Sequence, residues 1–193
     1  MYTNKIIAFP SKKEYPVYAE MYMDHIKKDG NLLTQLYDNF NTIKKFVASL
    51  SEKELNYKYA ENKWSIKEVL VHIIDDERIY GYRALTFARN DKTSLPGFEE
   101  KDYTRYADTY TRTIKNIMQE YEAVRMSTIT LFNGFSDDAL LRIGTANNNK
   151  TSVRALGYHI AGHELHHINI IKERYLTKKI KHNIKKSVKF RLV

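Results

Sequence analysis

The chain has 193 residues; 42% of them are apolar, 28% are charged, and cysteine is absent. This composition is typical of a folded globular domain and excludes a collagen-like or disordered chain. Without cysteine the chain cannot form disulfides, thiolate metal sites or iron–sulfur clusters. Any metal or acid–base chemistry must therefore depend on histidine, carboxylate, tyrosine and lysine side chains.

Stretches without charged residues are short throughout the chain. The longest covers eleven residues, from Met126 to Ser136, whereas a membrane-spanning helix needs about 20 apolar residues. The apolar run from Ile6 to Phe9 is also too short for the core of a signal peptide. Because the absence of cysteine fits a reducing compartment, the sequence predicts a cytoplasmic protein with no membrane partner.

The net charge of +9 is concentrated at the C-terminus. Residues 172–193 contain nine basic residues and one acidic residue, which leaves 23 basic and 22 acidic residues for the first 171 positions. We divide the chain into an N-terminal extension (1–28), a nearly neutral domain (29–176) and a basic C-terminal tail (177–193). Such a basic run is typical of a solvated end, and the alternative is contact with a nucleic acid or another anionic partner.

Helical periodicity dominates the domain, and no sustained alternation of period two is visible. From residue 29 to residue 50 the apolar positions are spaced by alternating threes and fours, which is typical of a helix packed on one side. Ser65 and Glu68 fit a capping box, which begins a second helix. The four long helices predicted in this way cover residues 29–50, 65–90, 110–135 and 151–176.

The connections between these helices are modest in length. We expect a polar loop over residues 144–150 and one short helix over residues 18–27, in a segment that also contains Pro10 and Pro16. Four long one-sided helices with such connections predict an all-α four-helix bundle, whose interior can hold a metal between facing helices.

Four histidines fall within nine residues of the last predicted helix: His159, His163, His166 and His167. At about 100° per residue, His159 and His167 lie about 40° to either side of His163 on the apolar stripe, and His166 lies nearer the flank. Two imidazoles four residues apart can bind one divalent transition metal. The spacing therefore indicates a metal site that still lacks a ligand.

His72 is the remaining histidine within a predicted long helix, and we expect it to be the third ligand. If the second and fourth helices are neighbours, it would join His163 and His167 in a three-histidine site with open positions, as in catalytic metal sites. Asp76, one turn further along, could orient a ligand, and Arg83 and Arg174 could hold an anionic group. The structural alternative is a set of hydrogen-bonded core histidines, although several buried imidazoles without partners would be costly to desolvate.

Residues 163–167 also match H-E-x-x-H, the zinc metalloprotease motif in which the glutamate is the general base. The context argues against a protease, since Ile170 and Glu173 stand where a metzincin needs glycine and histidine. Helix geometry alone does not exclude Glu164 from the site, because it lies about 60° from His167.

Several motifs together resemble the DinB-like superfamily, also described as YfiT-like metal-dependent hydrolases, over about residues 29–176. They are KWSIKEVLVH at 63–72, DDER at 75–78, LPGF at 95–98, VRAL at 153–156 and AGHELHH at 161–167. The resemblance implies an up-down-down-up four-helix bundle that binds a divalent metal through His72, His163 and His167. A pair formed by His159 and His163 is the alternative. The resemblance also implies a homodimer, because homodimers are common in the superfamily. It further implies a relationship to low-molecular-weight thiol S-transferases and mycothiol-dependent isomerases.

Two functional hypotheses follow. The first is a metal-dependent enzyme, a hydrolase or S-transferase in which the ion activates water or a low-molecular-weight thiol to act on a small-molecule substrate. Zinc or nickel is expected first, and iron or manganese also fit the ligand set; the thiol would have to come from a cofactor, since the chain has no cysteine. The second is a non-catalytic metal- or ligand-binding bundle whose basic tail contacts a nucleic acid or another anionic partner.

Overall fold

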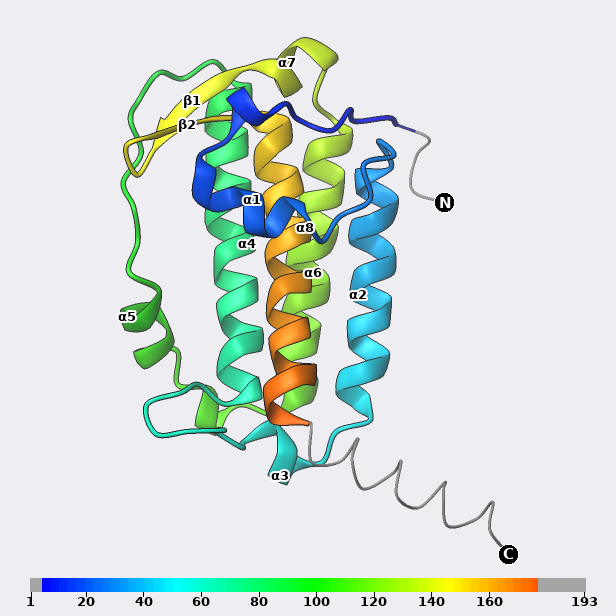
Figure 1. Ribbon diagram of the computed structural model, residues 1–193, viewed down its shortest axis with the longest axis vertical. Coiled ribbons are helices and arrows are strands. Elements are labelled where there is room, and N and C mark those ends of the chain that lie inside the picture. The colour runs from blue at the N-terminus through cyan, green and yellow to red at the C-terminus, as the bar shows by residue number, and fades with distance from the viewer. Residues whose placement is uncertain (1–4, 177–193) are drawn as a thin grey trace, which may run out of the picture.

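Four long helices lie side by side in the computed structural model, which describes residues 5–176 (Figure 1). They are α2 (Leu32–Ala48), α4 (Ile66–Ala88), α6 (Ile114–Asn133) and α8 (Val153–Ile170). The colours of Figure 1 show that α2 and α8 run in one direction along the bundle, whereas α4 and α6 run in the other. The predicted all-α, up-down-down-up four-helix bundle is therefore confirmed.

Short elements connect the long helices. Because α4 and α6 run in the same direction, residues 89–113 must return along the outside of the bundle, as Figure 1 shows. The short helical elements are η1 (Lys12–Glu14), η2 (Val17–Ala19), α1 (Glu20–Met23), α3 (Glu52–Leu55), α5 (Glu100–Arg105), η3 (Thr109–Thr111), α7 (Asp137–Leu141) and the π-helical turn η4 (Ile171–Tyr175). The short helix predicted over residues 18–27 is present as α1, directly after the 3₁₀ turn η2, but it ends at Met23, earlier than expected.

Capping residues determine where the long helices begin. The Ser65 hydroxyl accepts a hydrogen bond from the Glu68 amide at 3.2 Å, and the Glu68 carboxylate accepts one from the Ser65 amide at 2.6 Å, which confirms the predicted capping box. Thr113 caps α6 in a similar way through the amide of Asn116. The prediction that the third helix begins at Tyr110 is therefore wrong by about one turn, and Tyr110 is 81% exposed.

A β-hairpin replaces the polar loop predicted over residues 144–150. Its strands, β1 (Ile143–Ala146) and β2 (Asn149–Ser152), pair antiparallel, with Ala146 opposite Asn149. The two-residue turn consists of Asn147 and Asn148, whose φ angles are 48° and 60°. Asparagine tolerates this left-handed conformation, which a tight hairpin turn requires at both positions. The strands are too short to show the alternation that identifies a longer strand.

The apolar core consists of two clusters, one toward each end of the bundle. One cluster contains residues such as Leu33, Phe87 and Phe132, and the other contains residues such as Phe40, Ile73 and Ile117. Between them each long helix contributes buried or half-buried polar groups, which form the polar layer of the bundle: Asn39, His72, Asp76, Glu77, Arg125, His163, Glu164 and His167. Buried polar groups need partners, so this layer is where a functional site is expected.

The N-terminal segment packs over α8 beside the polar layer. At Gly162 a Cβ atom would lie 2.3 Å from the carbonyl oxygen of Tyr22, so only glycine permits this close approach. As a result the ring of Tyr22 covers three histidines of α8, with centroid distances of 4.9 Å to His159, 5.3 Å to His163 and 5.4 Å to His166.

Two expectations concern features beyond the bundle interior. Within residues 5–176, no helix combines the length and apolar character that crossing a lipid bilayer requires. The basic tail, residues 177–193, lies outside the described part of the chain, and so does any contact it makes with a nucleic acid. The division into segments 1–28, 29–176 and 177–193 and the cytoplasmic location stay predictions.

Candidate metal centre

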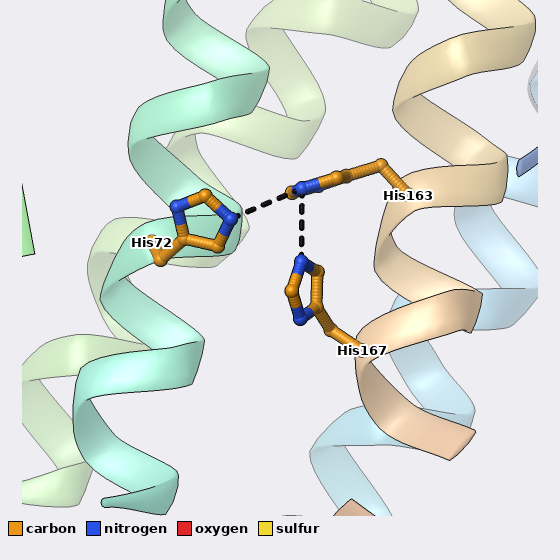
Figure 2. Close-up of side chains that lie close together, drawn as sticks. All are labelled: His72, His163 and His167. Atoms are coloured by element: carbon orange, nitrogen blue, oxygen red, sulfur yellow. Dashed lines mark hydrogen bonds between the residues drawn. The ribbon is translucent and has the colours of Figure 1, made fainter. Parts of the chain in front are cut away.

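Three of the predicted site residues, His72, His163 and His167, meet inside the bundle and form the three-histidine cluster (Figure 2). The Nε2 atom of His163 lies 3.1 Å from Nε2 of His72 and 3.0 Å from Nε2 of His167. His72 and His163 are 2% and 4% exposed, and His167 is half-buried. The cluster is therefore a buried point at which three ring nitrogens converge.

Helix geometry explains how the three rings meet. His163 and His167 are one turn apart on the same face of α8, and His72 faces them from α4, the neighbouring helix (Figure 2). The rings meet edge to face, with centroid distances of 4.9 Å for His72–His163, 4.8 Å for His72–His167 and 4.5 Å for His163–His167. The predicted proximity of the second and fourth helices is thus observed.

Burial keeps these imidazoles neutral. Desolvation lowers the pKa of His72 and, together with the neighbouring histidines, lowers the pKa of His163 well below its usual value. Desolvation also lowers the pKa of His167 to about 3. A neutral imidazole carries a lone pair on one ring nitrogen, and that form binds metal ions.

Asp76 contacts the opposite side of the His163 ring, as the sequence predicted for an orienting residue. Its Oδ2 atom lies 3.4 Å from Nδ1 of His163. Oδ2 forms no hydrogen bond of good geometry with any described residue, but a negative charge at this distance still favours the proton on Nδ1, which leaves the Nε2 lone pair directed at the other two histidines. Asp76 is 4% exposed, so the contact is shielded from solvent.

His159 does not join the three-histidine cluster. Its ring stacks on Tyr80 at a centroid distance of 3.7 Å, and its Nε2 atom lies 3.4 Å from Oδ2 of Asp76. Among the described residues, neither of these two atoms has a hydrogen-bond partner of good geometry. The alternative pair of His159 and His163 is therefore not the arrangement that converges on one point.

Glu164, the glutamate of the H-E-x-x-H match, points away from the cluster into the core. Its carboxylate accepts hydrogen bonds from Arg125 at 2.6 and 2.9 Å, from Tyr121 at 2.5 Å and from Asn39 at 3.0 Å. Since Glu164 is fully buried and engaged on both oxygens, it cannot act as a base on a ligand at the cluster. Glu164 is therefore unable to serve as the general base of a metalloprotease.

Glu100 is a site residue that the sequence analysis missed. It lies on α5, in the long connection outside the bundle, and its Oε2 atom is 3.8 Å from Nε2 of His72. Its side chain is 53% exposed. Residue 100 lies between the predicted long helices, in a segment without a periodic pattern, so only the path of the connection reveals its position.

Two cavities border the cluster, and each contains one of the predicted arginines. The first, of about 280 Å³, is lined by His163, His159 and Arg83, whose guanidinium donates to the carbonyl of Pro96 at 3.1 Å. The second, of about 250 Å³, is lined by His167 and Arg174. Both arginines therefore face space beside the cluster, where a ligand could lie.

The fold and the site together define an up-down-down-up helical bundle with a buried three-histidine centre. The sequence model of the DinB superfamily matches residues 35–171. The chain belongs to this superfamily.

Two curated relatives have related sequences. A protein from Oceanobacillus iheyensis named "Putative metal-dependent hydrolase OB0413" is 27% identical over 142 residues, which are 72% of this chain and 81% of the relative. A protein from Geobacillus thermodenitrificans named "Putative metal-dependent hydrolase" is 24% identical over 97 residues, 50% of this chain and 54% of the relative.

A solved structure shares the fold. It is described as "YfiT from Bacillus subtilis is a probable metal-dependent hydrolase with an unusual four-helix bundle topology", and it matches with a TM-score of 0.62 and 14% identity. The match covers 86% of this chain and 93% of that chain. At this identity the similarity concerns the fold.

Proposed function

We propose that the protein is a divalent-metal-dependent enzyme in which Nε2 of His72, His163 and His167 hold the ion. The observation that carries this proposal is the convergence of three buried, neutral imidazole nitrogens. Around a tetrahedral ion with bonds of about 2.0–2.1 Å to nitrogen, ligand atoms are about 3.3 Å apart. The separations of 3.0 and 3.1 Å are within a few tenths of an ångström of that value.

The donor set also favours a metal over a hydrogen-bonded cluster. His163 Nε2 faces two other ring nitrogens, and a single ring nitrogen can donate or accept but cannot pair well with both neighbours at once. A cation between the three lone pairs would satisfy all of them. Three neutral imidazoles suit zinc or nickel, and iron or manganese also accept nitrogen ligands.

A divalent ion with only three protein ligands supplies an open position at which the pKa of bound water or a bound thiol is lowered. The chain's own groups would complete the site. Asp76 would hold His163 in the metal-binding tautomer, and Glu100, 3.8 Å from His72 Nε2, would accept a proton from the nucleophile. The nucleophile is water or a low-molecular-weight thiol, and the substrate is a small molecule that fits the cavities beside the cluster.

Two further expectations belong to this proposal. The names of the relatives favour hydrolysis, whereas S-transfer from a thiol cofactor follows from the resemblance to thiol transferases; both reactions need the same activated nucleophile. The homodimer is also part of this proposal, and it is supported by the same resemblance.

Metal analysis of untagged protein tests the proposal. We expect about one divalent ion per chain in the wild type, and loss of that ion in His163→Ala. His166→Ala is the matched control, because His166 lies on the same helix but outside the three-histidine cluster, and it should retain the metal. Unchanged metal content in His163→Ala would remove the assignment.

A second experiment concerns catalysis. Metal-loaded protein should hydrolyse activated esters or amides, or transfer a thiol to an electrophile, and chelation should abolish the reaction. Glu100→Gln should lower kcat with unchanged metal content, because the ligands stay in place. If the metal-loaded protein shows no turnover with any combination of thiols and electrophiles, the non-catalytic binding module becomes the better interpretation.

A further inference from the structure

The cavity on the His167 side of the cluster has a distinctive lining. It is enclosed by the connection that precedes α4, by Val69 in the first turn of α4, by α5 and by the C-terminal end of α8 with η4. His167 forms part of its wall, so the cavity borders the three-histidine cluster directly. The other side chains that matter here are aromatic or cationic: Tyr59, Trp64, Tyr175, Lys63, Lys101 and Arg174.

Two cations of this cavity, Lys63 and Lys101, are available to a ligand. Among the described residues that line it, none is aspartate or glutamate. Within residues 5–176, Lys63 and Lys101 form no ion pair, whereas Arg174 donates to the Tyr59 hydroxyl at 3.3 Å and lies over the Tyr59 ring at 5.8 Å. Three positive charges around one cavity without a lining carboxylate repel one another, and an anion would relieve that repulsion.

The aromatic wall is held in a fixed arrangement. Tyr175 donates a hydrogen bond to the carbonyl of Trp64 at 2.7 Å, and the rings of Tyr59 and Tyr175 meet edge to face at 4.8 Å. The Trp64 ring in turn lies 4.9 Å from the ring of His72, a residue of the cluster. A flat apolar group placed against Trp64 is therefore brought close to the three-histidine cluster.

The cavity on the opposite side of the cluster has the opposite charge. Asp76, Glu99 and Glu100 line it, with Arg83 as the cation among them apart from the histidines. That guanidinium already donates to Pro96 and lies over the ring of Tyr80 at 4.8 Å. An anionic ligand is therefore directed to the His167 side, and the two cavities can distinguish the two ends of a reactant.

We propose that the cavity lined by Trp64, Lys63 and Lys101 binds the anionic end of a reactant, a carboxylate or phosphate group joined to a flat apolar or aromatic part. This inference rests on the metal-dependent function proposed above, and it specifies the substrate class. A volume of about 250 Å³ is slightly below the range of about 300–1,000 Å³ that is usual for drug-sized ligands. The ligand is therefore a small aromatic acid or one end of a larger molecule.

Trp64 provides a local signal for this binding, because it is the only tryptophan of the chain. The full-length protein is titrated with benzoate, with phenyl phosphate and with neutral benzyl alcohol at low ionic strength, while the emission of Trp64 is followed. We expect the preferred anion to bind about tenfold more tightly than the alcohol, and added salt should reduce the difference. Tighter binding of phenyl phosphate identifies a phosphate site, and tighter binding of benzoate identifies a carboxylate site.

Matched double variants test which charges are responsible. Lys63→Gln combined with Lys101→Gln should lower anion affinity about three- to tenfold and leave the affinity for benzyl alcohol unchanged. Lys45→Gln combined with Lys115→Gln removes the same charge from exposed positions of α2 and α6 and should have little effect. Equal losses in the two double variants, or equal affinities for the anions and the alcohol, would overturn the inference.

The titration is performed on chelator-treated protein as well as on metal-loaded protein. Anion selectivity in the chelated sample cannot come from the ion, so it reports on the cavity alone. Metal binding without anion selectivity would contradict the subsite and leave the metal-dependent function standing. Anion selectivity without metal binding would contradict the proposed metal-dependent function, whereas the anion-binding cavity would still stand.

Discussion

The polar layer of the bundle has two halves that differ in how completely their atoms are paired. In one half, the Arg125 guanidinium donates to the carboxylates of Glu77 and Glu164 and to the carbonyl of Leu36 at 2.6–2.9 Å. Tyr121 donates to Glu164 as well. We call these side chains, without Leu36, the Arg125 network. In the other half, the three-histidine cluster directs three neutral ring nitrogens at one point.

This difference separates a structural role from a binding role. The Arg125 network joins α4, α6 and α8 through Glu77, Arg125 and Glu164, and the hydrogen bond from Arg125 to the carbonyl of Leu36 adds α2. It also sets the rotation of α8, since Glu164 faces Arg125 while the adjacent His163 faces α4. A buried polar atom without a partner costs about 1–3 kcal/mol. The structure therefore satisfies the Arg125 network by itself, whereas the proposed metal ion would satisfy the three-histidine cluster.

Removing the centre of the Arg125 network should have the largest effect on stability. Arg125→Met leaves two buried carboxylates without their partner, and breaking a buried pair in this way costs about 3–5 kcal/mol. Urea denaturation should show this loss in the free energy of unfolding. Arg78→Met is the control, because Arg78 is 48% exposed in its ion pair with Glu120, and it should cost less than about 1 kcal/mol. A similar loss in both variants would show that the Arg125 network contributes no more to stability than a surface ion pair.

An apolar replacement in the three-histidine cluster should have the opposite profile. For metal-free His163→Leu, the free energy of unfolding should lie within about 1 kcal/mol of the wild-type value, because replacing the imidazole removes few hydrogen bonds of good geometry. The stabilisation gained by adding zinc should disappear, which amounts to about 2.7 kcal/mol at a hundredfold excess over Kd. Thermal denaturation with and without zinc measures both quantities. A large loss in the metal-free state would place the cluster in the structural half of the layer.

Asp76→Asn tests the carboxylate that lies against the three-histidine cluster, 3.4 Å from Nδ1 of His163. An amide at this position can no longer favour the proton on His163 Nδ1 as strongly, and loss of such a partner typically lowers metal affinity about 10- to 100-fold. A competition titration against a chromophoric chelator measures the change. Asp75→Asn is the neighbouring control on α4, since Asp75 is not part of the cluster and lines a different cavity, and the metal affinity of this variant should stay near that of the wild type.

Much of the fold and the three-histidine cluster could be predicted from local spacing. Capping at Ser65 and the apolar stripes located four helices to within a few residues, since both signals arise within one or two turns. His163 and His167 share a face because they are four residues apart, and adding His72 required only that two helices be neighbours. The DinB-like motifs supplied that topology.

The remaining site features depend on contacts between distant segments. Glu100 reaches His72 only because the connection after α4 returns along the outside of the bundle. On a helical wheel, Glu164 lies about 60° from His167, so spacing along α8 does not show whether it faces the cluster. Its direction is decided by its partner Arg125 on another helix. The hairpin had a local signal, the Asn147-Asn148 pair that suits a tight turn, but its four-residue strands show no clear alternation.

The ion pair between Glu14 and Arg154 gives the smallest expected effect and a test by pH. It joins the N-terminal segment to α8 at 2.6 and 2.7 Å, and its side chains are 13% and 18% exposed, so it lies between the buried Arg125 network and a surface pair. Hydrogen bonds from Arg154 lower the pKa of Glu14 from 4.5 to about 2. Because the folded-state pKa is lowered, the stabilisation is present above pH 4.5 and is lost as the pH falls toward 2.

Glu14→Gln should therefore cost roughly 1–2 kcal/mol at pH 7, and the difference from wild type should shrink over that acidic range. Glu20→Gln, which removes an exposed pair with Lys12, should have little effect on stability at any pH. A difference between Glu14→Gln and wild type that did not change between pH 7 and pH 2 would mean that the lost stability comes from packing and not from the charge.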